Sequence, residues 1–249
     1  MTDKILRCAT WNIHRAKGRD GRVDPDRIHR VVAEEIASDA LYLLALQEAD
    51  EECRPHGRIL DMARIEAETG LVYQHRSSHM RWSSGSDGFL GTILFLHPSF
   101  EVTYRDVLDL PGHCHRGAVS IEAAIETKPV RFLSMHLSLS QPLRIVQMRL
   151  VGQYLMRRPD MLTVLLGDFN EWRPWGGLMF HPRIVGRRFR GRACRTFPAI
   201  SPFLPLDRIL ADRPDAIRNI RTQTSLLIRE ASDHLPVCAE FTIPAPGEN

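Results

Sequence analysis

Four strand-like runs follow one another in the middle of the chain: Gly91–Leu96 (GTILFL), Val102–Val107 (VTYRDV), Gly117–Ile125 (GAVSIEAAI) and Val130–Leu137 (VRFLSMHL). Four strands in succession do not fit a doubly wound sheet, in which a helix follows each parallel strand. This stretch therefore favours an α/β fold in which two β-sheets pack together and the helices lie outside.

Strand-like and helix-like segments alternate in the rest of the chain. Asp24-Pro25 marks the start of one helix, with the aspartate as N-cap and the proline in the first turn. A second helix, Arg58–Thr69, closes at Gly70, and a third begins at Pro142. The apolar stripe predicted for this third helix consists of Leu143, Val146, Leu150 and Tyr154. The further strand-like runs are Ile5–Ile13, Leu41–Leu46, Met161–Leu166, Leu206–Leu210 and Pro236–Ile243.

The composition fits a globular protein with one large core. Its 249 residues are 43% hydrophobic, and no linker or low-complexity tract interrupts the interior. We predict one domain over residues 1–249, with a frayed tail at 244–249. The formal net charge of +3 does not by itself indicate a DNA-binding surface.

The cysteines indicate a reducing environment. Cys8, Cys53, Cys114, Cys194 and Cys238 are odd in number and widely spaced, which favours reduced thiols over a disulfide framework or a zinc ribbon. The N-terminus lacks the apolar stretch of a signal peptide, and no apolar segment approaches the length of a membrane span. We expect a cytoplasmic protein. The sequence leaves its oligomeric state open, and we take a monomer as the starting expectation.

Polar side chains stand at the ends of the strand-like runs, where a packed scaffold can present them in one cleft. Phosphate ester hydrolysis needs carboxylates that hold a hard divalent cation, a base that orients or deprotonates water, and donors that stabilise the transition state. The candidate residues for these tasks are Asn12, Glu48, His136, Asp168, Asn170, Asp207, Asp233 and His234.

Each of these residues also has a purely structural interpretation. Gly167-Asp168-Phe169-Asn170 can place an acid and an amide in one pocket, or it can form a turn. Asp233-His234 can supply a ligand and a phosphate-facing imidazole, or it can cap the last strand. Glu48 follows an apolar run, where a lone buried carboxylate is costly unless it is paired or bound to metal, but it also fits an exposed loop. His136 fits a core histidine, and Asp207 fits a surface partner of Arg208.

Six short motifs occur in an order that resembles the endonuclease/exonuclease/phosphatase superfamily, whose members include DNase I-like nucleases, sphingomyelinases and inositol polyphosphate 5-phosphatases. The resemblance spans nearly the whole chain and is closer to bacterial members of unassigned substrate. It implies a four-layer α/β sandwich of two mixed β-sheets flanked by helices. The motifs are Trp11-Asn12-Ile13, Leu46-Gln47-Glu48, Met135-His136-Leu137, Gly167-Asp168-Phe169-Asn170, Leu206-Asp207-Arg208-Ile209 and Ser232-Asp233-His234-Leu235-Pro236.

The resemblance also implies a role for each residue. Glu48 resembles the main Mg²⁺ ligand, with Asn12 and Asp233 beside it, and Mn²⁺ is an expected substitute. Asp168 resembles the residue that orients or deprotonates the attacking water. Asn170 resembles an amide that positions the phosphate or the water, and His136 resembles a histidine that contacts the phosphate. Asp207 resembles the residue that orients His234, and His234 resembles the donor to a phosphate oxygen.

Two departures separate this chain from apurinic endonucleases in the same superfamily. His14 stands where those enzymes carry an acid, two residues beyond Asn12, and His136 stands where they carry a tyrosine. Both differences lower the expectation of abasic-site repair. The stretches Pro111–Gly117 and Arg195–Pro198 resemble the bacterial members instead.

The expected reaction is in-line attack of water on a phosphodiester, with nucleic acid, a lipid head group or a small diester as substrate. Arg116, Trp172 and Trp175 are candidates for substrate contact, although the tryptophans also fit core positions and Arg116 a surface ion pair. A run of arginines could clamp an anionic backbone or remain a solvated loop. The alternative functions are a nuclease, a phospholipid head-group phosphodiesterase, and a catalytically silent binding module. The run comprises Arg183, Arg187, Arg188, Arg190, Arg192 and Arg195.

Overall fold

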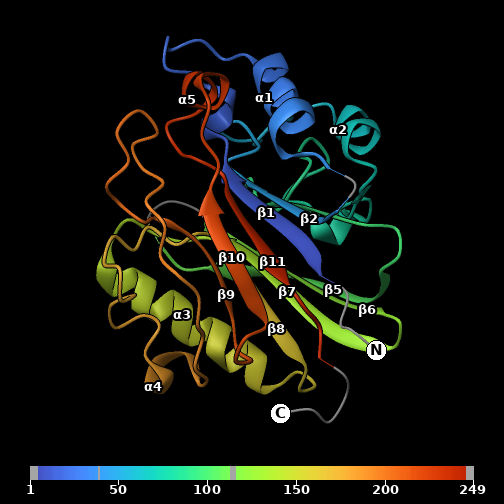
Figure 1. Ribbon diagram of the computed structural model, residues 1–249, viewed down its shortest axis with the longest axis vertical. Coiled ribbons are helices and arrows are strands. Elements are labelled where there is room, and N and C mark those ends of the chain that lie inside the picture. The colour runs from blue at the N-terminus through green and yellow to red at the C-terminus, as the bar shows by residue number, and fades with distance from the viewer. Residues whose placement is uncertain (1–4, 39, 113–115, 245–249) are drawn as a thin grey trace.

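The computed structural model describes residues 5–38, 40–112 and 116–244 (Figure 1). The strands in this part of the chain are β1 (Leu6–Asn12), β2 (Leu41–Gln47), β3 (Val72–Tyr73), β4 (Ile93–Leu96), β5 (Glu101–Leu110), β6 (Arg116–Ile125), β7 (Lys128–His136), β8 (Leu162–Asp168), β9 (Asp207–Ala211), β10 (Ile217–Thr222) and β11 (Val237–Phe241). The α-helices are α1 (Pro25–Val31), α2 (Met62–Thr69), α3 (Gln141–Met156), α4 (Pro182–Val185) and α5 (Leu226–Ala231).

The strands form two mixed sheets. One has six strands in the order β10-β11-β1-β2-β4-β3, and the other has five in the order β5-β6-β7-β8-β9. The pairs β1–β2 and β7–β8 are parallel, and the other neighbouring pairs are antiparallel. The four successive runs of residues 91–137 become β4, β5, β6 and β7, of which β4 lies in the six-stranded sheet and the rest in the other. The expected pair of mixed sheets is therefore confirmed.

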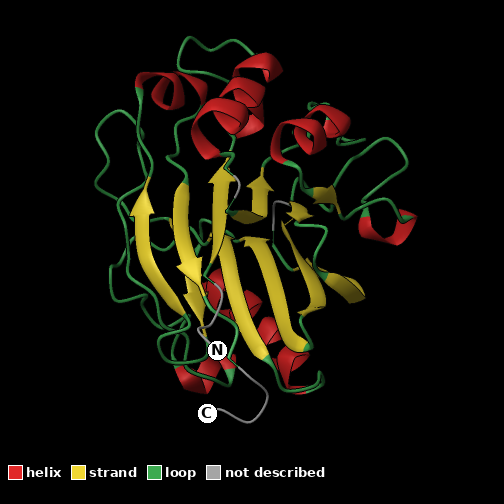
Figure 2. Cartoon of the chain, turned by 45° about the vertical axis from the view of Figure 1, so that its right-hand side comes forward, coloured by secondary structure: helices red, strands yellow, loops and turns green. Residues whose placement is uncertain are grey.

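The central strands of both sheets are buried on both faces, because the two sheets face each other and helices cover their outer sides (Figure 2). Neighbouring residues of one strand accordingly belong to different layers of core. Leu43 packs between the sheets, whereas Leu44 packs with α1 and α2. Leu166 likewise packs between the sheets, and Leu165 packs against α3. This arrangement is the four-layer sandwich, and it explains why several strands are continuous apolar runs rather than alternating ones.

Local signals position the first two helices. The side chain of Asp24 accepts a hydrogen bond from the backbone N–H of Arg27 at 3.2 Å and so caps α1. Asp61 caps α2 in the same way, which places the start of that helix later than the predicted Arg58. Gly70 ends α2 with a φ of 69°, as a left-handed C-cap requires.

The predicted apolar stripe of α3 is wrong at Val146 and Leu150, whereas Tyr154 packs against the core. Val146 and Leu150 are 47% and 37% exposed, whereas Arg144 and Gln147 are buried on the face toward the sheet. Arg144 donates to the carbonyl of Leu139 at 2.6 Å, and Gln147 donates to the carbonyl of Pro111 at 2.8 Å. These bonds to loop carbonyls allow both polar residues to lie on the buried face, beside Met148, Val151 and Leu155.

Some predictions concern residues outside the described part of the chain. These are the tail from residue 245 onward, Cys114, and the centre of the stretch 111–117. Cys8, Cys53, Cys194 and Cys238 carry free thiols. Within the described residues, no helix is long and apolar enough to span a membrane.

Candidate active site

Strand pairing brings the polar residues of each sheet to a common edge. In the five-stranded sheet His136 pairs with Asp168 across the parallel strands β7 and β8, and Asp168 pairs with Asp207 across β8 and β9. In the six-stranded sheet Asn12 ends β1, and Glu48 follows β2 directly. The amide nitrogen of Asn12 lies 3.2 Å from Glu48 Oε1 and 2.9 Å from Asp168 Oδ2. Asn12 therefore joins the two sheets at the site.

Asp168 is the buried carboxylate at the centre of this cluster. Besides Asn12, its partners include the backbone N–H of Asn170, which donates to Oδ1 at 2.8 Å. Burial and the neighbouring Asp207 raise the pKa of Asp168 to about 6, against the opposing effects of His234 and Asn12. A carboxylate with a pKa close to neutrality can accept a proton and later release it.

His234 lies against two carboxylates. Its Nδ1 is 2.8 Å from Asp207 Oδ2, and its Nε2 is 3.9 Å from Asp168 Oδ2. Burial alone would lower the pKa of His234, but the negative charges of Asp207 and Asp168 outweigh burial and raise it to about 10. The ring is therefore an imidazolium at neutral pH, with Nε2–H available as a donor.

The backbone around His234 is fixed by side chains of β1 and of its own loop. Trp11 Nε1 donates to the carbonyl of His234 at 2.9 Å. Ser232 Oγ accepts from the N–H of His234 at 3.1 Å and donates to the carbonyl of Asn12 at 2.8 Å. The ring of Phe197 packs against the imidazole with centroids 4.9 Å apart. These contacts hold the imidazole in place before any ligand binds.

His136 is the neutral counterpart of His234. Arg116 Nη1 lies 3.1 Å from His136 Nδ1, and a guanidinium can only donate, so Nδ1 accepts and Nε2 carries the proton. Burial, followed by the positive charges of Arg116 and His234, keeps the pKa of His136 well below its ordinary value. Nε2 faces Asp168 Oδ2 at 3.5 Å and Glu48 Oε1 at 3.8 Å. Arg116 thus sets the tautomer of His136.

A family model described as the endonuclease/exonuclease/phosphatase family matches residues 9–234, which include every residue of this cluster. The chain belongs to that family. Members of the family are phosphoric ester hydrolases. The family match and the two mixed sheets confirm the resemblance seen in the six motifs.

Individual proteins resemble the chain with 14–32% sequence identity. The uncharacterized protein YbhP of Escherichia coli (strain K12) is 32% identical over 162 residues, which cover 60% of this chain and 61% of that protein. The chain thus spans about 61% of the length of this curated relative. An endonuclease/exonuclease/phosphatase from Bacteroides vulgatus superposes with a TM-score of 0.70 at 14% identity, over 97% of this chain and 100% of its own. D. rerio TDP2 in complex with a single-strand DNA product gives 0.66 at 16% identity, over 96% and 100%. These two structures share the fold.

The structure brings together most of the residues singled out in the sequence. Asn170 donates from its side chain to the carbonyl of Leu137 at 2.9 Å and has a φ of 51°, which aims its loop across the end of β7. Asp233 differs from the others. Its carboxylate lies 3.5 Å from His14 Nδ1, and in the described part of the chain no hydrogen bond or ion pair joins it to Glu48 or Asp168.

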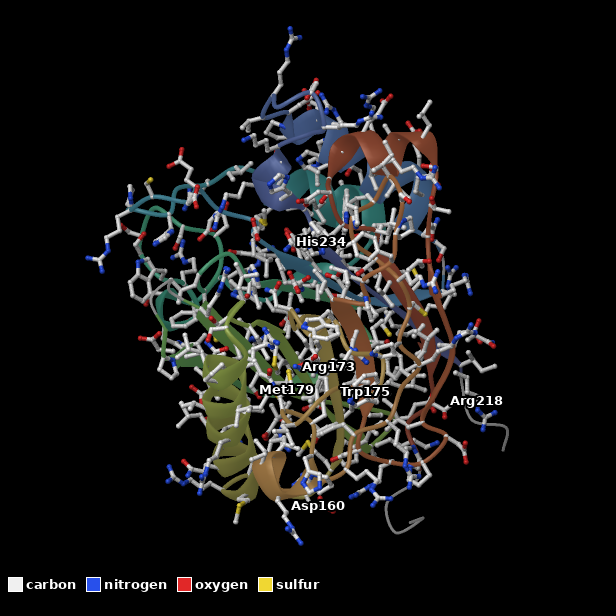
Figure 3. All side chains as sticks on the ribbon, turned by 90° about the vertical axis from the view of Figure 1, so that its left-hand side faces the viewer. Asp160, Arg173, Trp175, Met179, Arg218 and His234 are labelled. Atoms are coloured by element: carbon white, nitrogen blue, oxygen red, sulfur yellow. The ribbon has the colours of Figure 1, made fainter. Side chains whose placement is uncertain are left out.

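Trp172 and Trp175 occupy the loop after Asn170, and core packing does not account for them. They are 49% and 75% exposed, and the guanidinium of Arg173 stacks on Trp172 at 4.6 Å from the ring centroid. In Figure 3, Arg173 and Trp175 lie between His234 and Asp160, which is near the lower end of the molecule.

The arginine run does not form one uniform surface. Arg187 Nη1 donates to Asp212 Oδ2 at 2.7 Å, so its charge is already paired with a carboxylate. Arg190 and Arg192 line a surface hollow together with Arg218, which lies away from His234 in Figure 3.

Sequence reasoning missed Arg15. Its Nη1 lies 2.8 Å from Asp50 Oδ1, and its Nε lies 3.6 Å from Glu48 Oε2, so it adds positive charge beside the carboxylate. Arg15 has a φ of 54° within a short irregular turn, and nothing in the local sequence pattern indicates that this turn folds back on Glu48. Ser232, in contrast, belongs to a motif already noted and could have been identified from it.

The donors favour one position for a cation. Asp168, Asp207 and His234 place ligand atoms within 4.8 Å of one another. However, His234 as an imidazolium has no lone pair to offer a metal. Glu48 supplies the carboxylate oxygens that hard divalent cations prefer, and its side chain is 18% exposed. Asn12 turns its amide nitrogen toward Glu48 and Asp168 and its oxygen toward the N–H of His14, so it becomes an oxygen ligand only after its amide turns over. The chemistry of these donors therefore fits a hard cation at Glu48, beside Asp168.

Proposed function

We propose that this protein is a Mg²⁺-dependent phosphodiesterase that cleaves a P–O bond by in-line attack of water. The observation that carries the proposal is the pair Asp168 and His234, which lie 3.9 Å apart and have pKa values of about 6 and about 10. When the pKa values of two neighbouring groups lie this far apart, one group can accept a proton while the other keeps its proton and acts as a donor in the same reaction.

Each residue of the site has its own role in the proposed hydrolysis. Asp168 accepts a proton from the attacking water, whose oxygen forms the new bond to phosphorus while the bond to the leaving alkoxide breaks. Nε2–H of His234 donates to the phosphate oxygen that gains negative charge, and Asp207 balances the positive charge of the ring. Asn170 positions the phosphate or the water, and neutral His136 offers a second donor through Nε2–H.

A divalent ion fits the same scheme. Glu48 would hold it, and Asn12 would join Glu48 once its amide oxygen turns from the N–H of His14 toward the ion. Asp233 is a weaker candidate because its carboxylate lies beside His14. When bound, Mg²⁺ or its substitute Mn²⁺ would neutralise phosphate charge and polarise the phosphorus centre.

The test uses bis-p-nitrophenyl phosphate and p-nitrophenyl phosphate with Mg²⁺. We expect hydrolysis of the diester, inhibition by EDTA, recovery with Mg²⁺ or Mn²⁺, and loss of activity in Asp168→Ala. Hydrolysis of the monoester alone would reject the diester assignment. A folded native protein inactive on both substrates would favour a silent binding module.

A nucleic-acid substrate is the second candidate, and the exposed Trp172 and Trp175 are the observation that favours it. Stacked bases contribute about 1–3 kcal/mol each in single-strand binding. The D. rerio relative with bound single-strand DNA agrees with this choice. Salt-sensitive binding of single-stranded DNA, lost in Trp172→Ala/Trp175→Ala, would support a nuclease. Selective cleavage of phospholipid would support a head-group phosphodiesterase instead.

We also propose that residues 1–249 form one catalytic unit that acts as a cytoplasmic monomer. The free thiols are compatible with a reducing compartment. Light scattering of the purified protein tests the oligomeric state.

A further inference from the structure

Arg15 lies beside Glu48, and the proposed hydrolysis gives it no task. The two oxygens of the Glu48 carboxylate have different neighbours. Oε1 is 3.2 Å from the amide nitrogen of Asn12 and 3.8 Å from His136 Nε2, so it faces the catalytic groups. Oε2 instead lies 3.6 Å from Arg15 Nε. Glu48 therefore presents one oxygen to the catalytic groups and the other to a guanidinium.

The guanidinium of Arg15 connects Glu48 to a second carboxylate, that of Asp50. Nη1 of Arg15 donates to Asp50 Oδ1 at 2.8 Å and to the backbone carbonyl of Asp50 at 2.7 Å. The Asp50 side chain is only 3% exposed, so its negative charge needs a partner within the protein. His56 Nδ1 lies farther away, at 3.6 Å from Asp50 Oδ2. Arg15 thus supplies a positive charge that both carboxylates share.

The turn that carries Arg15 has a strained backbone. His14, Arg15 and Ala16 have φ values of 48°, 54° and 56°. This left-handed conformation costs about 1–2 kcal/mol for each residue that is not glycine. The turn is held in it partly by Glu48, whose carbonyl accepts a hydrogen bond from the N–H of Arg15 at 3.1 Å. Strain of this kind persists only where surrounding contacts enforce it, and such places are often functional sites.

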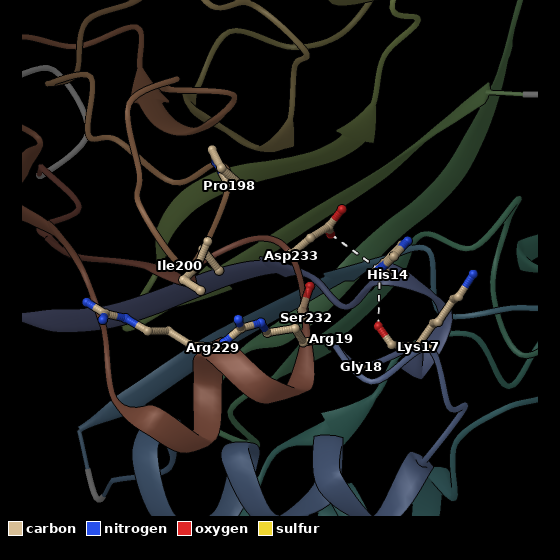
Figure 4. Close-up of a pocket in the computed structure, with 11 residues that line it drawn as sticks. His14, Lys17, Gly18, Arg19, Pro198, Ile200, Arg229, Ser232 and Asp233 are labelled. Atoms are coloured by element: carbon tan, nitrogen blue, oxygen red, sulfur yellow. Dashed lines mark hydrogen bonds and ion pairs between the residues drawn. The ribbon is translucent and has the colours of Figure 1, made fainter.

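His14 anchors the same turn toward a different loop. Its Nδ1 donates to the carbonyl of Lys17 at 3.1 Å and lies 3.5 Å from Asp233 Oδ1 (Figure 4). Its backbone N–H donates to Asn12 Oδ1 at 3.0 Å. The backbone around Arg15 is therefore already ordered, which lowers the entropy lost when the guanidinium is held beside Glu48.

Gly91, just before β4, fixes the other partner of Arg15. It has a φ of 75°, and a Cβ there would lie 2.6 Å from Asp50 Oδ1 and 3.2 Å from the Cα of Glu48. Glycine permits this close approach. The carbonyl of Gly91 also accepts a hydrogen bond from the N–H of Ala49 at 2.9 Å. The segment that carries both carboxylates is thus held in place by β4.

Arg15 occupies the place where a second cation would need its ligands. Enzymes that use two divalent ions hold them about 3.5–4 Å apart. Beside Oε2 of Glu48, the carboxylate for a second hard ion would be that of Asp50, but the guanidinium already bridges the two side chains. An arginine is charged at every pH at which proteins are folded, and unlike an ion it cannot dissociate.

We propose that Arg15 takes the place of a second divalent cation, so that the site binds one ion, and that Arg15 acts as a positioning residue for Glu48. The proposal rests on the proposed cation at Glu48 and specifies the number of ions. The positive charge of Arg15 repels another cation and neutralises Asp50. Oε1 of Glu48 is left for the single ion.

Calorimetric titration with Mn²⁺ counts the ions directly. We expect one ion per chain in the native protein and in Arg15→Lys, which keeps the charge. Arg15→Met, which removes the charge, should bind two ions, and Arg15→Met/Asp50→Asn should bind one again. Arg58→Met is the matched control and should bind one ion, since Arg58 Nε also pairs with a buried aspartate, at 3.0 Å from Asp87 Oδ1.

Thermal unfolding covers the case in which Arg15→Met folds poorly. Without metal, Arg15→Met should have a lower Tm than the native protein, because Asp50 loses the partner of its buried charge. Mn²⁺ should then raise the Tm of Arg15→Met by more than it raises the native Tm, because two ions bind the folded chain.

The outcomes separate this proposal from the proposed function. An Arg15→Met protein that binds one ion, or that Mn²⁺ stabilises no more than it stabilises the native protein, would overturn the role of Arg15. Two ions in the native protein would also overturn it and would leave metal-dependent hydrolysis intact. A native protein that binds no Mn²⁺ would reject the cation at Glu48, and with it the proposed function.

Discussion

Asp168 and His234 hold protons in opposite ways although their side chains are neighbours. Asp168 is buried beside Asp207, which disfavours its charged form, while His234 is buried between two carboxylates, which favours its charged form. The same low-polarity site therefore contains a carboxylate that can take up a proton near neutral pH and an imidazolium that keeps one. At the scale of single residues, this contrast is the strongest support for acid–base chemistry.

Replacing Asp168 by asparagine should remove the carboxylate that accepts the proton and keep the size and shape of the side chain. We expect Asp168→Asn to lower kcat on bis-p-nitrophenyl phosphate by about 10²–10⁴-fold. Asp160→Asn is the control, since Asp160 is a 69% exposed aspartate just before the other end of β8. Equal activity of Asp168→Asn and the native protein would refute the assigned role.

His75 makes a pH-dependent contribution to stability, away from the active site. Its Nδ1 lies 2.9 Å from the carbonyl of Met80, and its Nε2 accepts from the N–H of Leu94 at 2.9 Å. Burial is the main cause that lowers the pKa of His75 from its ordinary 6.5 to about 4. Between these values the unfolded chain binds a proton that the folded chain does not, so this contribution is present above pH 6.5 and is lost as the pH falls toward 4.

Urea unfolding at pH 6.5 and pH 5 measures this contribution. From pH 6.5 to 5 the native protein should lose about 1.5 kcal/mol more stability than His75→Gln, because the slope reaches its full value of about 1.4 kcal/mol per pH unit only below pH 6.5. The variant His79→Gln replaces an exposed histidine four residues away and should retain the native pH dependence. A His75→Gln protein with the same pH dependence as the native one would contradict the explanation.

At the scale of elements, strand β8 depends on Gly167, which directly precedes Asp168 at the end of the strand. Gly167 has a φ of 129°, and a Cβ there would lie 2.0 Å from the carbonyl oxygen of Met135 on β7. A side chain would push apart the two strands that place His136 and Asp168 side by side.

We expect Gly167→Ala to lower the free energy of unfolding by about 3 kcal/mol or more, because backbone strain and overpacking add up. Gly70→Ala is the matched comparison, since Gly70 also has a positive φ of 69°, but a Cβ there would meet no atom within 4 Å. That change should cost only about 1 kcal/mol. Urea denaturation compares the two variants, and equal losses would show that the approach to Met135 is unimportant.

At the scale of the whole molecule, the site lies at the junction of the two sheets. Glu48 and Asn12 come from the six-stranded sheet, and Asp168 and His136 come from the five-stranded one. A cation at Glu48 that binds only the folded chain would therefore stabilise both sheets together.

Thermal unfolding with Mg²⁺ or Mn²⁺ tests this coupling. At a concentration about 100 times the Kd, binding adds about 2.7 kcal/mol, and Tm should rise by about 5–10 °C. Glu48→Gln should abolish most of the rise. Glu52→Gln, at an exposed glutamate nearby, should preserve it. A rise of the same size in Glu48→Gln would place the cation elsewhere.

The sequence by itself determined the strand-like runs, the first two helices and the polar residues at strand ends. These features follow from apolar runs, caps and turn residues, which act over a few neighbours. Short or polar elements such as β10 and α5 were not predicted, because an edge strand or a very short helix contains too few residues to show a periodic hydrophobic pattern. The stripe of α3 was misassigned because the helix buries two polar residues, Arg144 against the loop just before α3 and Gln147 against the distant carbonyl of Pro111.

Only the tertiary structure decided which polar groups meet. Asn12 and Asp168 are separated by 156 positions along the chain, yet their side chains are hydrogen-bonded. Arg15 beside Glu48, Arg116 on His136 and Asp233 turned toward His14 also depend on how two sheets and their loops pack. Local patterns carry no information on such distances. Burial and Asp207 raise the pKa of Asp168, whereas the negative charges of Asp207 and Asp168 outweigh burial and raise the pKa of His234, and both effects exist only where the packed sheets bring these groups together.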